Sequence, residues 1–417
     1  MAGLRPVSAL RSAGRWVTCW AASAQGAYPV GSAIAQPDLS NALPEPTEGL
    51  QDQSLRMILR PALWSLGWRL RLSNVFGQRE LRLCGLRLGL HWGGGALVPG
   101  TSAALPDQTI APGCAVWTPA VELPWTAAPS SEAFLGRSLA LSAWVEGASG
   151  PVTWHAKAMA TSYLSAPGDR EAAGQDGELG FPHTTTSTFF VDALDAWLPA
   201  PARALVALGD SLTDGTATTL NGQDRWTDVL QRCWWAAGCR DKALVNAGIG
   251  GNQVVGPPAS AGPWRGGPSA VDRLQRDVLE LSGADTVIWM QGINDFSDNG
   301  GAEADQVIAA MHSAVGRLRA RGLKVVGATV PSALHGTRPG HGGAEQDARR
   351  RAFNAWMRSG GAFDVVADVD AVLTDPVTGC LRAEFNGDNT LGEPGDGVHP
   401  NRAGHAAMAR CFLAALT

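Results

Sequence analysis

The hydrophobic pattern of this chain changes its period near residue 200, and that change limits the folds open to the chain. Between about residues 50 and 195, Leu alternates with Arg or polar residues, most clearly in residues 68–77 and 79–90. A period of two is typical of half-buried strands, because successive side chains of a strand point to opposite faces. Residues 137–145 and 187–191 repeat the pattern after breaks rich in Gly, Pro, Asn and Asp. The first half therefore predicts an antiparallel β-sandwich.

After Pro199 and Pro201, short apolar runs alternate with amphipathic helical stretches. The expected strands cover residues 204–208, 243–246, 286–291, 324–330 and 365–369, and the expected helices cover residues 225–237, 270–281, 304–321, 345–358 and 402–416. This alternation predicts a five-stranded parallel sheet with helices on both faces, which is an α/β three-layer sandwich. A length of 417 residues suits two to three domains. The change of period favours two, a β-sandwich-like accessory domain over residues 1–198 and an α/β domain over residues 203–417.

Composition and charge exclude several classes of protein. The 33 basic and 38 acidic residues give a net charge of −5, which offers no positive field to nucleic acid. No run approaches the ~18 apolar residues that a membrane-spanning helix requires. Arg5, Arg11 and Arg15 interrupt the first twenty residues, so we expect no signal peptide in the chain as given. We therefore expect neither nucleic acid nor a membrane span, and the compartment and oligomeric state stay open.

The cysteine and histidine spacings do not predict a metal site. The seven cysteines are scattered without the CxxC or Cys/His spacing of a zinc site. We expect free or buried thiols, with one disulfide in an exported form as the alternative. His335 and His341 stand in a stretch rich in Gly and Pro, for which we expect a solvated loop rather than a metal site.

Polar and small residues follow the expected strands of the α/β half, at the edge where open α/β sheets bind ligands. Ser211 follows the first strand in a Gly-Asp-Ser-Leu sequence, and a glycine-rich stretch over residues 246–252 follows the second. Asn294 follows the third strand, and Asp396 stands three residues before His399 ahead of the last helix. Each segment alone has an ordinary structural explanation, as a helix cap, a glycine turn, an Asx-turn or a surface pair. Together they supply a nucleophile, a base, an orienting carboxylate and oxyanion donors, which predicts one active site.

These four segments resemble the sequence blocks of the SGNH (GDSL) hydrolases, a family named for a Ser, a Gly, an Asn and a His. The matching segments are residues 209–212, 246–252, 292–295 and 396–400. The resemblance implies the SGNH-hydrolase, flavodoxin-like form of the α/β fold for residues 203–417. Residues 16–25 and 69–77 are similar to segments of the β-rich domain that precedes the catalytic domain in one bacterial subgroup of these esterases.

The resemblance implies a role for each matching residue. Ser211 would be the nucleophile, His399 the general base and then the general acid, and Asp396 the carboxylate that orients His399. The oxyanion donors would be the backbone N–H groups of Ser211 and Gly251 and the side-chain amide of Asn294. Gly250 is the alternative to its neighbour Gly251.

Three further residues would support this site. Gly209 allows close approach of the backbone, Asp210 belongs to the first block, and Asp295 braces the loop that carries Asn294. Trp264 and residues 383–395 are the expected rim of the substrate pocket.

The resemblance implies a serine esterase that hydrolyses carboxylic esters through an acyl-enzyme, without a cofactor or a metal ion. We expect short-chain acyl or acetyl esters of a small molecule or a carbohydrate. The same machinery would serve an acyltransferase, a lipase or a thioesterase, and a catalytically silent carbohydrate-binding protein is the alternative from another class. Relatives are often secreted or periplasmic. For the first half we favour support of the fold over carbohydrate binding or shaping of the acyl pocket.

Overall fold

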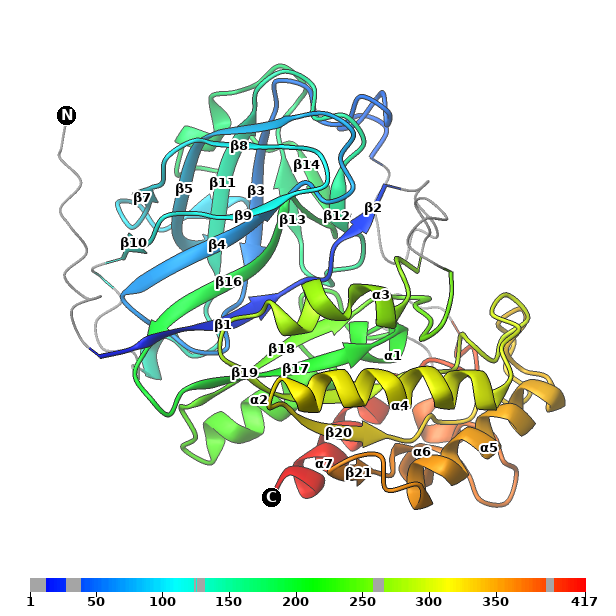
Figure 1. Cartoon of the computed structure of the whole chain (residues 1–417). Coiled ribbons are helices and arrows are strands. Elements are labelled where there is room, and N and C mark those ends of the chain that lie inside the picture. Colours follow the sequence, from blue (N-terminus) through cyan, green and yellow to red (C-terminus); the bar gives the residue numbers. More distant parts are fainter. Residues whose placement is uncertain (1–12, 28–38, 124, 126–131, 258–265, 388–393) are drawn as a thin grey trace. The chain divides into compact units, whose positions relative to one another are not determined.

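The computed structural model describes residues 13–27, 39–123, 125, 132–257, 266–387 and 394–417 (Figure 1). The chain divides into two units. Unit 1 contains residues 1–204 and 239–243, and unit 2 contains residues 205–238 and 244–417. In the described part of the chain, no helix combines the length and hydropathy needed to cross a membrane.

Unit 1 is built from antiparallel sheets. Its strands are β1 (Arg15–Ala21), β2 (Gln25–Gly26), β3 (Ser54–Leu59), β4 (Gly67–Ser73), β5 (Leu81–Gly93), β6 (Ala96–Leu97), β7 (Ala103–Ala104), β8 (Gln108–Ile110), β9 (Ala115–Trp117), β10 (Val121–Glu122), β11 (Leu139–Val145), β12 (Thr153–His155), β13 (Ser162–Leu164), β14 (His183–Thr185), β15 (Thr188–Phe189) and β16 (Val191–Leu198). One sheet has the order β1-β16-β4-β10, with β9 paired to β4. A second has the order β14-β13-β3-β11-β5-β6, with β7 and β8 paired to β5, and a third has the order β15-β12-β2. The first half is therefore β-rich and antiparallel, as expected.

Strand β5 shows how the alternating pattern produces a one-sided strand. Leu81 and Leu83 are buried and Arg82 between them is exposed, as the period of two predicts. The phase then shifts, because one extra residue stands in β5 opposite β11, and Gly85 there has a φ of +59°. Such a bulge returns the later leucines of β5 to the buried face.

The strand expected over residues 187–191 is divided in two. Phe190 has a φ of +57°, outside the extended region, and it separates β15 from β16. These two strands belong to different sheets. The expectation of one continuous strand was wrong at this residue, because the hydrophobic pattern carries no information on the backbone turn.

Unit 2 contains the five-stranded parallel sheet that the sequence predicted. Its strands are β17 (Arg203–Gly209), β18 (Lys242–Gly248), β19 (Ala284–Met290), β20 (Lys324–Ala328) and β21 (Val365–Ala367). Their order in the sheet is β18-β17-β19-β20-β21. The chain therefore runs outward in both directions from β17. In such a sheet, the point where the strand order reverses is the usual place for a ligand site.

Helices cover both faces of this sheet. They are α1 (Ser211–Asp214), α2 (Trp226–Ala236), α3 (Ala270–Leu274), α4 (Ala304–Ala320), α5 (Ala344–Ser359), α6 (Val369–Leu373) and α7 (Arg402–Leu416). Helices α3, α4 and α5 pack side by side on one face, and α2 and α7 pack together on the other (Figure 1). The expected helix over residues 270–281 differs from the observed structure, because α3 ends at Leu274 and a π-helical turn, Gln275–Leu279, continues it.

Candidate active site

The carboxyl ends of three adjacent strands bring the candidate residues together. Ser211 begins α1 just after β17, Gly251 lies just after β18, and Asn294 lies just after β19. Because β17 lies between β18 and β19 in the sheet, the three loops meet at one edge. His399 reaches the same place from the turn before α7.

Ser211, His399 and Asp396 form a continuous line of hydrogen bonds. Ser211 Oγ lies 2.8 Å from His399 Nε2, and His399 Nδ1 lies 2.6 Å from Asp396 Oδ2. An ionised carboxylate only accepts, so Nδ1 carries the ring hydrogen and Nε2 accepts from the Ser211 hydroxyl. Ser211 and His399 expose only 5% and 4% of their surface. The arrangement can therefore move the Ser211 proton to His399 in a site that largely excludes water.

The turn before α7 holds Asp396 in the ionised form. Its Oδ1 accepts from the backbone N–H of Val398 at 2.9 Å and from that of His399 at 2.8 Å. Burial alone would raise the pKa of Asp396, but the hydrogen bond and charge of the His399 ring and these two N–H groups lower the pKa below its usual range. The carboxylate therefore keeps the ring hydrogen of His399 on Nδ1.

Gly209, at the end of β17, lies so close to its neighbours that no side chain fits. A Cβ added there would lie 2.3 Å from Thr213 Oγ1 and 2.6 Å from Met290 O. Met290 O is a backbone atom of β19 and cannot move without disturbing the sheet. Glycine at this position thus permits the close packing of the turn that carries Ser211.

The candidate oxyanion donors come from the three loops. Gly251 has a φ of +80°, a conformation that favours glycine. Asn294 exposes 8% of its surface, and its Nδ2 donates to Asn252 O at 3.0 Å. An amide nitrogen carries two hydrogens, so a second one remains to be donated. In the described part of the chain, the backbone N–H groups of Ser211 and Gly251 have no acceptor.

Asp214 distinguishes the two adjacent glycines of the loop after β18. Its Oδ2 accepts from the Gly250 N–H at 2.8 Å. The N–H of Gly250 is therefore already engaged, whereas that of Gly251 is not engaged by any described residue.

A buried arginine ties the loops to the sheet. Arg273 donates to Gly209 O at 2.9 Å, to Ala247 O at 2.8 Å and to Asn252 Oδ1 at 3.0 Å. It also forms an ion pair with Asp277 at 3.0 Å, with both side chains almost fully buried. One guanidinium thus connects the ends of β17 and β18 with Asn252, whose backbone carbonyl accepts a hydrogen bond from the Asn294 amide.

Asp210 and Asp295 are buried carboxyl groups beside the site. Asp295 accepts from the backbone N–H groups of Val254 at 2.9 Å and Val255 at 3.0 Å, which links the loops after β18 and β19. Burial raises its pKa to about 7, although these two N–H groups act in the opposite direction. Burial also raises the pKa of Asp210 to about 7, with the N–H of Leu212 opposing and the charge of Asp295 adding to the increase. Both groups therefore titrate near neutral pH.

Four residues at or beside the site were not predicted from the sequence. Asp214 stands in the same segment as Ser211, and this proximity is a signal that could have indicated it. Arg273 and Asp277 have the i, i+4 spacing of a helical ion pair, but the spacing does not reveal that the pair is buried. His341 was expected in a solvated loop, which was wrong for its side chain, since that side chain is buried.

Part of the expected pocket rim lies outside the described residues. Trp264 and residues 388–393 belong to this part of the chain. Of the remaining rim, Ala383–Phe385 forms a short 3-10 helix. In the described residues, no group of three or more His, Cys, Asp or Glu side chains could hold a metal ion.

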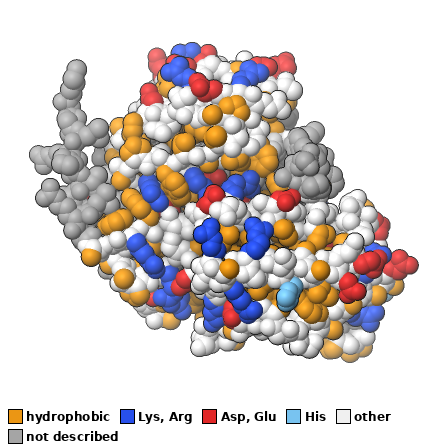
Figure 2. Space-filling model, in the orientation of Figure 1, with side chains coloured by type: hydrophobic (Ala, Val, Ile, Leu, Met, Phe, Trp, Pro, Cys, Tyr) orange, Lys and Arg blue, Asp and Glu red, His pale blue; other side chains and the backbone are white. Residues whose placement is uncertain are grey.

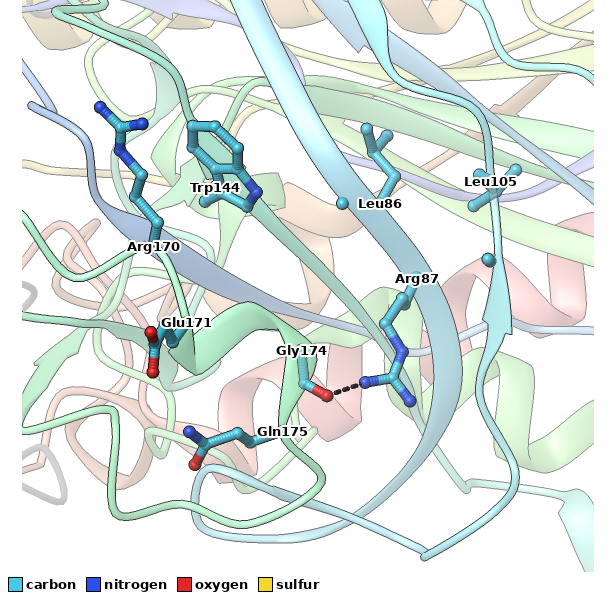
Figure 3. Close-up of a pocket in the computed structure, with 10 residues that line it drawn as sticks. Leu86, Arg87, Leu105, Trp144, Arg170, Glu171, Gly174 and Gln175 are labelled. Carbon is cyan, nitrogen blue, oxygen red and sulfur yellow. Dashed lines mark hydrogen bonds between the residues drawn. The ribbon is translucent and has the colours of Figure 1, made fainter. Parts of the chain in front are cut away.

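Unit 1 has a hollow of its own, of about 580 Å³. Figure 3 shows Trp144, Arg170, Glu171 and Gln175 around it. The guanidinium of Arg170 lies 5.0 Å from the centre of the Trp144 ring, and this contact occupies that aromatic face. None of the candidate catalytic residues lines this hollow.

Comparison with known proteins assigns the α/β unit to a family. Residues 207–407 match the model of the GDSL-like lipase/acylhydrolase family. A search of curated proteins finds no match. Similar solved structures include the lipase/acylhydrolase from Enterococcus faecalis, at 20% identity over 51% of this chain and 94% of that one, with a TM-score of 0.38. A carbohydrate acetylesterase family member from Sinorhizobium meliloti is 19% identical over 51% of this chain and 97% of that one, with a TM-score of 0.39.

The match over residues 207–407 places this protein among the carboxylic ester hydrolases. Those residues match the GDSL-like lipase/acylhydrolase family, and a β-rich region precedes them in the chain.

Proposed function

We propose that the protein is a serine esterase that hydrolyses short-chain acyl or acetyl esters through an acyl-enzyme. The observation that carries this proposal is the line of hydrogen bonds from Ser211 through His399 to Asp396, with separations of 2.8 Å and 2.6 Å. A serine hydroxyl is a weak nucleophile at its ordinary pKa and needs an adjacent base, which in turn needs an orienting group.

The reaction has two steps. In the first, Ser211 Oγ attacks the ester carbonyl carbon while His399 Nε2 takes its proton. The tetrahedral intermediate then expels the alcohol, which receives that proton from His399. In the second step, water attacks the acyl-enzyme with His399 again as base, and the carboxylic acid leaves Ser211. Asp396 keeps the imidazole oriented and stabilises the imidazolium in both steps.

The oxyanion of each tetrahedral intermediate would be held by the backbone N–H groups of Ser211 and Gly251 and by the side-chain amide of Asn294. The Gly250 N–H is engaged by Asp214, and this supports Gly251 rather than Gly250 as the donor. Such donors act on charge that develops in the transition state and lie in place before the reaction begins.

The enclosure of the site supports a small acyl group. Ser211, Asn294 and His399 expose 5%, 8% and 4% of their surface, which suits an acetyl group better than a long chain. The charge of the protein suits an uncharged ester. Acidic and basic side chains are scattered among hydrophobic and uncharged ones over the face in Figure 2, and the net charge is −5.

For the whole chain, we propose a catalytic domain over residues 203–417 and an accessory domain over residues 1–198. The accessory domain would be a β-sandwich that supports the fold. This interpretation is supported by a single buried cluster that contains residues of both larger sheets, among them Leu55 and Leu141 from one and Leu70 and Leu194 from the other.

Hydrolysis of p-nitrophenyl acetate tests the proposed activity. The wild-type protein and the Ser313→Ala variant, which changes an exposed serine of α4, should release nitrophenol at equal rates. Ser211→Ala should abolish the release without loss of folding. A folded Ser211→Ala variant with undiminished activity would overturn the proposal.

Two further assays separate the alternatives. Capture of the acyl group by an added alcohol in preference to water would identify an acyltransferase. A panel of acetyl, butyryl and octanoyl esters and acyl thioesters distinguishes a short-chain esterase from a lipase or thioesterase. A folded protein inactive on all of them would favour the silent carbohydrate-binding protein.

A further inference from the structure

The loop between β20 and α5 places a buried histidine against Asn294. His341 exposes 7% of its surface, and its Nε2 lies 3.2 Å from Asn294 Oδ1. Its Nδ1 lies 2.9 Å from Pro339 O in the same loop. No step of the proposed reaction uses this imidazole.

The contact with His341 completes the restraint of the Asn294 amide. Asn294 Nδ2 donates one hydrogen to Asn252 O at 3.0 Å, and Oδ1 faces His341. If the amide turned over, its oxygen would face the carbonyl oxygen of Asn252 without a hydrogen between them. With its oxygen held, the amide presents its second hydrogen in one fixed direction. Without the histidine, the terminal torsion of an Asn side chain has a broad, shallow preference.

We propose that His341 is a positioning residue of the oxyanion hole, which fixes the orientation of the Asn294 amide through a hydrogen bond from Nε2 to Asn294 Oδ1. This inference rests on the proposed function, because Asn294 acts as an oxyanion donor only if the site forms tetrahedral intermediates. His341 acts through Asn294 and does not touch the reacting atoms.

The loop that carries His341 is fastened on both sides of the site. Gly340 O accepts from the Asp298 N–H at 2.9 Å, and Thr337 N donates to Asp396 O at 2.8 Å. The loop thus contacts the segment after Asn294 on one side and the backbone of Asp396 on the other. A rigid loop of this kind can hold an imidazole to within the small tolerance that an oxyanion hole requires.

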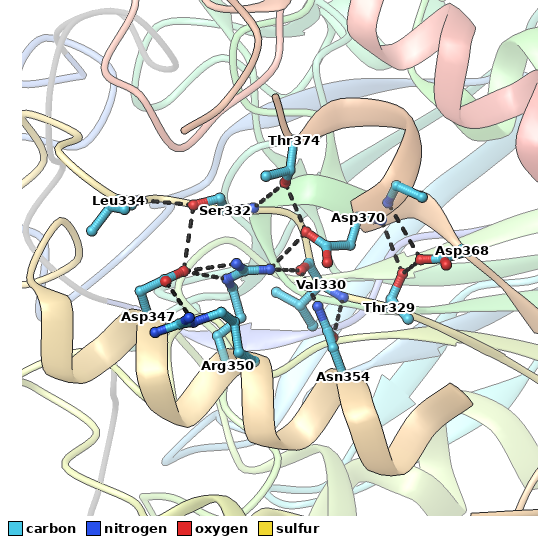
Figure 4. A network of polar contacts seen from close by, with 12 residues as sticks. Thr329, Val330, Ser332, Leu334, Asp347, Arg350, Asn354, Asp368, Asp370 and Thr374 are labelled. Atoms are coloured by element: carbon cyan, nitrogen blue, oxygen red, sulfur yellow. Dashed lines mark hydrogen bonds and ion pairs between the residues drawn. The ribbon is translucent and has the colours of Figure 1, made fainter. Parts of the chain in front are cut away.

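A buried polar network fixes the point where the loop leaves β20. Arg350 lies among Asp347, Asp370 and the carbonyl of Val330, as Figure 4 shows, with its Nη1 2.6 Å from Asp370 Oδ1. Ser332 Oγ belongs to the same network and accepts a hydrogen bond from the backbone N–H of Leu334 at 3.0 Å. The loop therefore begins from a rigid base.

The protonation of His341 decides whether the contact is attractive. Both ring nitrogens face carbonyl oxygens, so the doubly protonated ring satisfies both contacts and the neutral ring satisfies one. Burial lowers the pKa of His341, the Pro339 carbonyl opposes this, Arg338 and His399 lower the pKa further, and Asp396 raises it. The inference requires a hydrogen on Nε2 in either form.

A double-mutant cycle tests the coupling. His341→Ala should lower kcat on p-nitrophenyl acetate about 10- to 100-fold with little change in KM, since the amide aligns with the transition state and not with the ground state. His341→Gln, whose amide can donate to Asn294, should recover most of the loss. In an Asn294→Ala background, His341→Ala should cost nothing further. A full additional loss in that background would overturn the inference.

Two controls separate failure of this inference from failure of the proposed function. His335→Asn changes an exposed residue of the same loop, where a φ of +60° suits Asn, and should leave kcat unchanged. Nitrogen-15 NMR of histidine-labelled protein, with the His341 signals assigned by their loss in His341→Gln, should show a hydrogen on Nε2. An Nε2 without hydrogen overturns the contact itself. If Nε2 carries a hydrogen but the protein has no esterase activity, the proposed function is overturned instead. The role of His341 in catalysis is then overturned as well, although its contact with Asn294 stands.

Discussion

Asp396 meets His399 at two points, with Oδ2 2.6 Å from the ring Nδ1 and Oδ1 2.8 Å from the backbone N–H. Oδ1 also accepts from Val398 N, so one oxygen is committed to the backbone and the other to the imidazole. The two oxygens therefore have different tasks, although they belong to one carboxylate. The same turn holds both the carboxylate and the imidazole.

This division of tasks predicts the effect of Asp396→Asn. The amide oxygen of the new side chain should take the place that faces the backbone N–H groups, which leaves its NH₂ group against His399 Nδ1. The imidazole must then carry its hydrogen on Nε2, where it cannot accept the proton of Ser211. We expect kcat to fall on the order of 10³- to 10⁴-fold with a retained fold, as measured by ester hydrolysis and circular dichroism. Asp305→Asn, on the exposed face of α4, is the matched control, and equal activity of the two variants would contradict this role.

Arg273 should contribute more to the free energy of unfolding than a surface arginine does. Arg273→Met leaves the buried Asp277 with Arg276 as its remaining ion-pair partner. It also removes the donor to three acceptors, at the ends of β17 and β18 and on Asn252. We expect a loss of about 3–5 kcal/mol in the free energy of unfolding, measured by urea titration. Arg319→Met breaks an exposed pair with Asp364 and should cost less than about 1 kcal/mol. Equal losses in the two variants would show that the buried connection does not stabilise the fold.

Glycine at position 209 is required by close packing. Gly209→Ala places a methyl group against Met290 O, and we expect a lower Tm and a poor yield of folded protein. Gly316→Ala is the matched control, because Gly316 is exposed in α4 and an added Cβ meets nothing there within 4 Å. Alanine should stabilise α4 by about 0.5–1 kcal/mol. If Gly209→Ala kept the wild-type Tm, the close approach would not be essential.

The stability of the protein should depend on Asp210 as the pH rises. The pKa of Asp210 is raised to about 7 in the folded protein, so the unfolded chain gives up this proton first. Asp210 therefore makes its full contribution to the free energy of unfolding below the ordinary pKa of an aspartate. This contribution is lost as the pH rises through 7. Between pH 5 and pH 8, the wild type should lose about 2–3 kcal/mol relative to Asp210→Asn, measured by urea titration at each pH. Asp305→Asn should follow the wild type, and parallel curves for Asp210→Asn and the wild type would contradict the prediction.

The sequence predicted those features that local pattern determines. The helix expected over residues 402–416 coincides with α7, and the five expected strands are β17 to β21, because the period of a segment follows from its own side chains. The sequence did not predict the π-helical turn after Leu274 or the break at Phe190. A change of backbone conformation at a single residue does not alter the hydrophobic pattern of the segment around it. His341 was missed for another reason. Its partner Asn294 is 47 residues away in the chain, and only the folded sheet brings the two loops together.

Covalent labelling can identify the nucleophile, which we propose to be Ser211. A fluorophosphonate probe reacts with an activated serine, so after proteolysis mass spectrometry should find one labelled peptide, with the probe on Ser211. Ser211→Ala should take no label, and Ser313→Ala should be labelled like the wild type. A folded wild-type protein that takes no label, or takes it on another serine, would show that Ser211 is not the activated nucleophile.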